Sequence, residues 1–443
     1  MRNKLRYLLG LLFAFAAAAP AYALLPIQHW QTQNGARVYF VETRDLPMLD
    51  VSVDFPAGSV FDTRAKSGLA ALTANTLRLG AGGLTEDEIA RRMADTGAQL
   101  GGRFDSDRAG VSLRTLTSPD EFKQAIDVFA RVLQHPEFPP AVLEREKTRI
   151  IAAIKEADTK PEVILNRNFN ALIYGNHPYG LRSAGEPATI ATLTRDDVSG
   201  FYRSYYTADQ AVVAIIGSIG RGEAEALANQ LTAGLPRSST PAVIPPVPDL
   251  ARSEMRAVAH PATQSHLLIG APGIRRDDPD YFPLFVGNYI LGGGGFVSRI
   301  TEEVRSKRGL AYSAYSYFSP LKERGPFVIG LQTRRDQAAE ALAVVRATLK
   351  EFLAKGPTAD ELKKAQQNIV GGFALRIDSN RKILDYLGAI GFYRLPLTYL
   401  DDFIPNVEKV TLADIRNAFA RRVDPEHMAT VIVGADEAAL GPK

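Results

Sequence analysis

Short stretches in which apolar residues alternate with polar ones, or run without interruption, recur along the first half of the chain and predict β-strands. The predicted strands are 37–41, 49–55, 109–116 and 211–216. Between them, apolar residues recur every three or four positions and predict helices. The predicted helices are 67–79, 85–96, 118–133, 140–157, 162–174 and 194–205. Strands mixed with helices indicate an α/β (α+β) fold.

The second half repeats part of this pattern. Segment 193–217 matches segment 410–434 without a gap, so the offset is 217 residues (410 − 193). Both segments read as a capped helix followed by a buried strand and a glycine. Residues 236–250 hold five prolines and no helical or strand period, which is typical of an extended linker. We therefore predict two similar α/β domains, 24–235 and 251–443, joined by linker 236–250.

The beginning of the chain has the pattern of a secretory signal peptide, predicted to span 1–23. Basic residues precede an apolar stretch at 8–19, and AYA at 21–23 fits a cleavage site near Ala23. No cysteine follows to carry a lipid, and no later apolar run is long enough to span a bilayer. The mature chain is expected to be periplasmic, without a membrane anchor.

Length, charge and cysteine content narrow the classes of function. At 443 residues, two domains or more are expected. Removing the three basic residues of the signal from the 52 Lys and Arg leaves 49, against 49 Asp and Glu. The mature chain is thus close to neutral, and nucleic-acid binding driven by net positive charge is not expected. With no cysteine, disulfides, thiolate metal sites and cysteine catalysis are excluded.

One stretch of the second half, LGGGGFVSRITEEVRSKRGLAYSAYSYF at 291–318, stands out. Its four consecutive glycines predict a loop that can approach another chain closely. They are Gly292, Gly293, Gly294 and Gly295. Apolar positions then predict a short helix over 297–308, ended by Gly309, and aromatic residues predict a strand over 312–318.

Arg308 and Tyr312 flank the predicted corner between this helix and this strand. A guanidinium and a phenol so placed can hold a peptide through its carbonyl or carboxylate oxygens. The alternative is structural, because an arginine complements the dipole at a helix C-terminus and a strand tyrosine is commonly packed.

Several short motifs occur along the chain and add to this evidence: AGS at 57–59, GLA at 68–70, HPYG at 177–180, GGGGF at 292–296 and EVRSKRGLAYS at 303–313. With them, essentially the whole mature chain resembles the pitrilysin/insulinase family of zinc peptidases, in its smaller bacterial two-domain branch. The resemblance implies two homologous domains, each a mainly antiparallel sheet packed with helices. It also implies that Arg308 and Tyr312 hold substrate peptide against a zinc site in an N-terminal domain.

The zinc motif of that family is missing. The family carries His-x-x-Glu-His after a segment like GLA, and the matching positions here are Ala71, Ala74 and Asn75. The third ligand, a glutamate in the family, falls at Ala152 or Ala153. Alanine cannot bind zinc, so the resemblance implies a vacated metal site and no cofactor bound by this chain.

No other catalytic or metal-binding motif takes the place of the missing zinc motif in the sequence. None of the six histidines pairs with another at the spacing of a helical zinc site, and His177 in HPYG is expected to be a structural hydrogen bonder. His260 and His266 flank a turn-like segment and are read as a chance pairing. There is no Gly-x-Ser-x-Gly elbow and no phosphate-binding loop, and the Ser-x-x-Lys at 319–322 lacks its companion motifs.

The resemblance therefore implies a non-catalytic, substrate-binding subunit of a periplasmic heteromeric zinc endopeptidase, inactive alone. Its partner would be a homologous zinc-bearing chain, in a heterodimer or larger assembly, and its ligand a peptide. The glycine loop would let the peptide add as a strand at a sheet edge. Two alternatives remain open: a purely structural subunit of the same fold, and a free-standing peptide-binding or chaperone-like protein.

Overall fold

The structure, a computed structural model, describes residues 26–237 and 243–434. The predicted signal peptide and residues 238–242 of the predicted linker lie outside the described residues. The described residues of that linker, 236–237 and 243–250, contain no helix or strand. No helix in the described ranges is long and apolar enough to cross a membrane.

The first half contains a six-stranded sheet and a small two-stranded one. The strands are β1 (Gln28–Gln31), β2 (Arg37–Glu42), β3 (Met48–Phe55), β4 (Gly80–Ala81), β5 (Leu84–Thr85), β6 (Gln99–Phe104), β7 (Ala109–Leu116) and β8 (Val212–Gly217). The helices are α2 (Leu69–Thr76), α3 (Glu86–Asp95), α4 (Pro119–Gln134), α5 (Pro140–Ala157), α6 (Pro161–Tyr174), α7 (Pro187–Thr192), α8 (Arg195–Tyr205) and α9 (Arg221–Thr232). In the large sheet the order is β1-β2-β8-β3-β7-β6, and only β2 and β8 pair in parallel.

The second half contains a five-stranded sheet. Its strands are β9 (Glu254–Val258), β10 (Gln264–Pro272), β11 (Ala311–Phe318), β12 (Pro326–Arg334) and β13 (Ala429–Val433). Its helices are α10 (Tyr281–Asn288), α11 (Arg299–Thr301), α12 (Ala338–Lys355), α13 (Ala359–Gly371), α14 (Asn380–Tyr393), α15 (Tyr399–Lys409) and α16 (Leu412–Arg422). The order is β11-β12-β10-β13-β9, with only β13 and β9 parallel.

Apart from the additional edge strand β1, the two large sheets have the same topology, which confirms the duplication. The sequence β6-β7-β3-β8-β2 in the first half corresponds, strand by strand and sense by sense, to β11-β12-β10-β13-β9 in the second. The repeat at an offset of 217 residues maps α8 onto α16 and β8 onto β13. Both helices begin with the same reciprocal cap, Thr194 with Asp197 and Thr411 with Asp414. The predicted mainly antiparallel sheets packed with helices are therefore confirmed.

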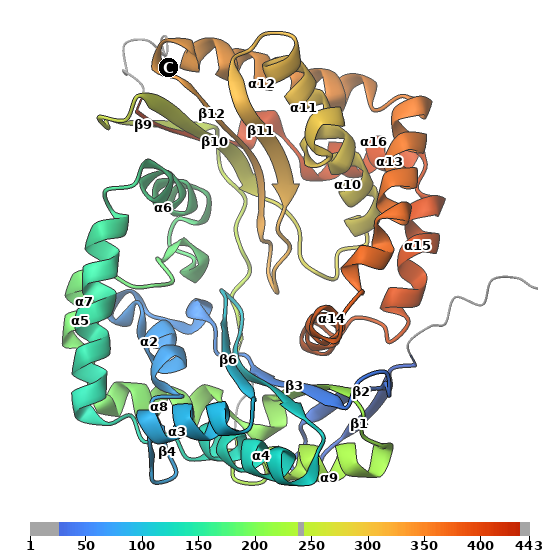
Figure 1. Cartoon of the computed structure of the whole chain (residues 1–443). Helices are drawn as coiled ribbons and strands as arrows, with labels where there is room; N and C mark the ends of the chain where they lie inside the picture. The colour runs from blue at the N-terminus through green and yellow to red at the C-terminus, as the bar shows by residue number, and fades with distance from the viewer. Residues whose placement is uncertain (1–25, 238–242, 435–443) are drawn as a thin grey trace, which may run out of the picture.

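One helix of each half packs against the sheet of the other half, and Figure 1 shows both helices. Helix α6 of the first half packs against β10 and β13, and α14 of the second half packs against β2, β3 and β8. Phe169 of α6 is buried over Gly270 of β10, where an added Cβ would lie 2.9 Å from the phenyl Cζ. This exchange fastens the two halves together through apolar contacts.

Buried charges add polar contacts between the halves. Asp54 of β3 is fully buried and accepts a hydrogen bond from Arg103 at 3.2 Å. The same guanidinium also pairs with Asp385 of α14. Asp107 accepts hydrogen bonds from Tyr393 of the second half at 3.0 Å and from the backbone N–H of Lys322 at 2.7 Å. The halves are thus held by both packing and hydrogen bonding.

Candidate functional site

Strand β11 forms an edge of the second sheet. It pairs with β12 and, within the described part of the chain, with no other strand. Its register with β12 skips Tyr312, because Ala311 faces Thr333 and Ser313 faces Gln332. Such a β-bulge turns a side chain away from the sheet, and the Tyr312 side chain is 81% exposed. The backbone edge of β11 and the phenol of Tyr312 are therefore both accessible.

The rest of the edge strand is aromatic on its exposed side. Tyr315 and Tyr317 lie outward along β11, with ring centroids 5.9 Å apart and planes inclined by 12°. Ala314 and Ser316 lie on the buried side. This alternation is that of a half-buried strand, so the prediction of a strand over 312–318 is confirmed, and β11 begins one residue earlier.

The glycine run is not the loop that the sequence predicts. Residues Tyr289–Gly293 form a π-helical turn that continues α10, and Gly295–Val297 forms a 3₁₀ turn. Among the four glycines only Gly295 has a positive φ, +61°. Gly292 is needed for a different reason, because a Cβ there would lie 2.5 Å from the backbone nitrogen of Ser316 on β11. Close packing against the edge strand, rather than loop conformation, accounts for this glycine.

The helix predicted over 297–308 is shorter and partly wound as a π-helix. After Ser298 it runs through α11 and then through a π-helical turn, Glu302–Ser306, before Gly309 (φ +63°) ends it. Val297 lies outside the helix and is 72% exposed, so it does not belong to the predicted apolar face. Ile300 and Val304 are fully buried, as the periodicity predicts. π-turns within helices are often found at functional sites.

Arg308 lies on the surface after this helix. Its Nη1 donates to the backbone oxygen of Glu303 at 2.8 Å and to Glu303 Oε2 at 2.6 Å. Hydrogen bonds from Lys307 and then from Arg308 hold the pKa of Glu303 below its ordinary value. Within the described residues, neither Nε nor Nη2 of Arg308 has an acceptor. The guanidinium is thus anchored by one nitrogen and retains donors for a ligand.

Tyr312 is held by Arg305 rather than by Arg308. The Arg305 guanidinium lies 4.5 Å from the ring centroids of both Tyr312 and Phe296, an arrangement that favours cation–π attraction. Phe296, immediately after the glycines, is 71% exposed. This contact could not be predicted from the sequence, since no spacing pattern links Arg305 to an aromatic ring. Arg305 and Phe296 thus extend the site beyond Arg308 and Tyr312.

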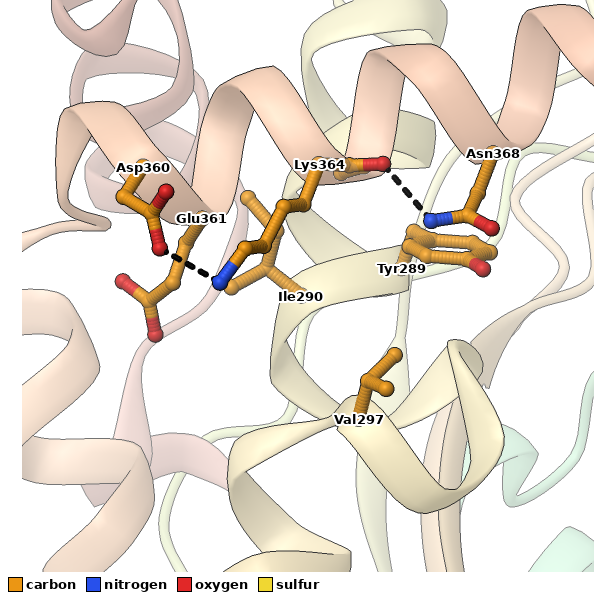
Figure 2. A pocket seen from close by; sticks show the side chains of 8 residues that line it. Tyr289, Ile290, Val297, Asp360, Glu361, Lys364 and Asn368 are labelled. Atoms are coloured by element: carbon orange, nitrogen blue, oxygen red, sulfur yellow. Dashed lines mark hydrogen bonds and ion pairs between the residues drawn. The ribbon is translucent and has the colours of Figure 1, made fainter.

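A cavity of about 230 Å³ lies beside the glycine segment, between it and α13 (Figure 2). Tyr289, Ile290 and Val297 line one side of it, and polar side chains of α13 line the other. Glu361 is the most strongly held of these. Although burial opposes ionisation, hydrogen bonds from Arg299 and Thr358 outweigh it and lower the pKa of Glu361 to about 2. The cavity wall therefore carries a permanent negative charge, balanced by Arg299.

The positions of the missing zinc motif do not fit a zinc ion. Ala71 of α2 is buried, Ala74 is half-buried and Asn75 is exposed, and Ala152 and Ala153 lie exposed on α5. These side chains offer methyl groups and one carboxamide, whereas zinc in proteins takes imidazole, thiolate or carboxylate. Within the described ranges, no group of three or more histidine, aspartate or glutamate side chains could hold a metal.

The helix of the missing zinc motif and the strand of Tyr312 lie in different parts of the molecule. Figure 1 places α2 at the lower left of the molecule and β11 at the upper centre. The strand that carries Tyr312 therefore does not lie beside the helix that carries Ala71 and Asn75.

His177 has the structural role that the sequence predicts. Its Nδ1 accepts a hydrogen bond from the backbone N–H of Tyr179 at 3.1 Å, and its Nε2 lies 2.8 Å from the carbonyl oxygen of Pro245 in the linker. The ring ties the turn after α6 to the linker.

A buried carboxyl group caps α2, the helix of the vacated motif. Asp62 accepts hydrogen bonds from the backbone N–H groups of Gly68 at 2.7 Å and Ala70 at 2.8 Å. Burial raises the pKa of Asp62 from 3.8 to about 7, against the effect of these two bonds. Between these two pH values the folded chain keeps a proton that the unfolded chain has released. Stability is therefore expected to fall as pH rises through this window.

We expect the free energy of unfolding to decrease by on the order of 1–4 kcal/mol between pH 4 and pH 8 because of this one group. Asp62→Asn should lose stability at pH 4, since its amide accepts fewer hydrogen bonds, and should show a flatter pH profile. Urea unfolding at several pH values measures both. Asp95→Asn, at an exposed position, is the control. An Asp62→Asn profile as steep as the wild-type profile would contradict the assignment.

The family model described as "Insulinase (Peptidase family M16)" matches residues 38–186, and "Peptidase M16 inactive domain" matches residues 192–369. A solved structure of a peptidase M16 inactive domain from Pseudomonas fluorescens is 37% identical, with a TM-score of 0.89, over 93% of this chain and 98% of that one.

Two curated relatives are more distant. The "Non-peptidase homolog YmxG" of Helicobacter pylori is 25% identical over 401 residues, 89% of this chain and 91% of its own length. A "Mitochondrial-processing peptidase subunit beta" of Lentinula edodes is 23% identical over 352 residues, 76% of this chain and 75% of its own length.

Proposed function

Because the chain belongs to the insulinase (M16) peptidase family and lacks the zinc ligands of its active members, we propose that it is a non-catalytic, substrate-holding subunit of a heteromeric zinc endopeptidase. The partner would be a homologous chain that carries the zinc. The name of the Lentinula edodes relative, a subunit of a processing peptidase, is consistent with such an assembly. Export of the mature chain to the periplasm is part of the same proposal.

One observation carries the proposal: Tyr312 and Arg308 are exposed at the start of β11, an edge strand that pairs with β12 alone in the described part of the chain, and both keep hydrogen-bonding atoms without a partner there. Tyr312 extends from a β-bulge, and Arg308 is fixed by one nitrogen to Glu303. An architectural role would not need an exposed phenol and an exposed, anchored guanidinium at the same corner. Within the described part of the chain, the Tyr312 ring contacts Arg305 and Arg308 Nη1 bonds Glu303, but the Tyr312 hydroxyl and the Nε and Nη2 of Arg308 have no hydrogen-bond partner.

In the proposed complex this chain binds and orients a peptide. The free donors of Arg308 would bind a peptide carbonyl or carboxylate oxygen, and the hydroxyl of Tyr312 would donate to a carbonyl oxygen. Donors placed where negative charge develops lower the barrier to acyl transfer. The metal chemistry would belong to the partner chain.

The edge of β11 offers a second way to bind the peptide. An extended peptide can add to an exposed strand through backbone hydrogen bonds, while side chains at alternate positions give specificity. Here the exposed rings of Tyr312, Tyr315 and Tyr317 would contact alternate residues of the peptide. The glycine segment supports this edge from behind through the contact of Gly292 with Ser316.

The test is reconstitution. Peptide hydrolysis is measured for this chain alone, for a homologous chain with an intact His-x-x-Glu-His motif alone, and for their mixture, each with zinc and with chelator. We expect the mixture to cleave at least about tenfold faster than the zinc-bearing chain alone. Zinc-dependent cleavage by this chain alone would overturn the proposal. A mixture no faster than the zinc-bearing chain would favour the purely structural role.

A further inference from the structure

A second cavity, of about 290 Å³, lies where the two halves and the linker meet. Its wall includes β2 of the first sheet, linker residues, the turn between β11 and β12, and the end of α14. Phe61, Ile244 and Phe392 give it an apolar part. This volume lies just below the range of about 300–1,000 Å³ that is usual for small-molecule pockets, so the cavity suits a small ligand.

Three cationic side chains line this cavity: Arg37, Lys322 and Arg394. None of them forms an ion pair with any residue that the structure describes. Arg37 donates a hydrogen bond to the carbonyl oxygen of Gly391 at 3.0 Å, and the side chains of the other two have no acceptor in the described ranges. Burial first, and then repulsion from Arg394, lowers the pKa of Lys322. The cavity thus concentrates positive charge that no ion pair within the described residues balances.

The carboxylates in the same wall are already engaged elsewhere. Asp107 accepts hydrogen bonds from the hydroxyls of Tyr179 and Tyr393 and from the backbone N–H of Lys322. Glu323 Oε1 lies 3.7 Å from Nη1 of Arg275, which is not one of the three cationic side chains of the cavity. Neither carboxylate pairs with the cations of the cavity.

The backbone at Arg394 strengthens the argument. This residue follows α14 in the left-handed region, with φ +56° and ψ +43°. Glycine is the usual residue at such a helix end, because a side chain is disfavoured there. Arg394 therefore adopts a disfavoured backbone conformation, and its guanidinium is the third cationic group at the cavity.

We propose that this cavity binds a small organic anion, a carboxylate or phosphate attached to an apolar group. The oxyanion would be held by Arg37, Lys322 and Arg394, and the apolar group would contact Phe61, Ile244 and Phe392. Because both halves and the linker contribute to the wall, a bound anion fixes the halves in the arrangement seen here. The site is separate from Arg308 and Tyr312 and does not depend on the proposed peptidase role.

The experiment is calorimetric titration of the full mature chain with three probes of similar size: phenylacetate, phenyl phosphate and neutral phenylacetamide. We expect at least one of the two anions to bind with a Kd below about 1 mM, and phenylacetamide to bind at least about tenfold more weakly. The tighter of the two anions identifies the head group. If neither anion binds, or if phenylacetamide binds as tightly, the proposal is wrong.

The decisive variant is Arg394→Gly, because glycine suits the backbone at this position and the fold should not be weakened. It should bind the anion at least about tenfold more weakly, while its melting temperature stays at or above that of the wild type. Lys322→Met should weaken binding in the same way. Arg252→Ala, whose side chain is 82% exposed outside the cavity, is the control and should bind normally. Unchanged binding by Arg394→Gly would overturn the proposal.

Discussion

Replacing Arg308 with alanine should lower the kcat/KM of the reconstituted peptidase by about 100-fold, while leaving this chain folded. The expected size is that of removing one preorganised donor from developing negative charge. The guanidinium is exposed and, within the described residues, forms hydrogen bonds and an ion pair with Glu303 alone, so its loss should change stability by less than about 0.5 kcal/mol. Steady-state kinetics with a fluorogenic peptide measures the first effect and thermal unfolding the second.

Lys307→Ala is the matched control for this variant. Lys307 is adjacent, exposed and paired with the same carboxylate, at 2.6 Å from Glu303 Oε1. If Arg308 acts only by balancing Glu303, the two variants should lose activity equally, and the substrate-holding role would be contradicted. If Arg308 binds substrate, Lys307→Ala should keep nearly full activity.

Kinetic parameters separate binding from transition-state stabilisation. Loss of uniform peptide binding raises KM alone, whereas loss of an interaction made only in the transition state lowers kcat. Tyr312→Phe retains the ring that contacts Arg305 and removes only the hydroxyl, so its effect reports on the hydroxyl alone. Activity unchanged in both Arg308→Ala and Tyr312→Phe would leave the architectural role as the better explanation.

Much of the fold could be predicted because local patterns and the internal repeat point to the same structure. The helix predicted over 140–157 and the strand over 109–116 have these same bounds in α5 and β7. The threonine caps of α8 and α16 are local signals, so the duplicated segment could be found from the sequence. In each case the residues that decide the element lie within it.

What the sequence did not predict depends on contacts between distant segments. The apolar face of α6 shows that the helix is buried, but not that it covers the sheet of the other half. The glycine run predicts a loop, because glycine permits unusual backbone conformations. Gly292 is instead required by its contact with Ser316, a residue 24 positions away (316 − 292). The bulge at Tyr312 and the contact with Arg305 likewise arise only once β11 is paired and the helix is packed.

The packing of α6 against the second sheet leads to the largest expected effect on stability. Phe169 of α6 is 1% exposed and lies in an apolar cluster with Leu268, Val328 and Val431 of the second sheet. Phe169→Ala should lower the free energy of unfolding by about 3–5 kcal/mol, because it removes a phenyl group and leaves a cavity. Chemical denaturation measures this loss.

Phe129→Ala separates an effect on the junction of the halves from a general loss of packing. Phe129 is fully buried, but it lies in the core cluster of the first half alone. The two variants should lose similar stability, whereas only Phe169→Ala should speed amide hydrogen exchange in β10 and β13, the strands that α6 covers. Local opening of these strands would show that α6 holds the second sheet in place. Two results would show that α6 contributes little to the junction of the halves. One is equal amide hydrogen exchange in both variants, and the other is a decrease in the free energy of unfolding below about 1 kcal/mol for Phe169→Ala.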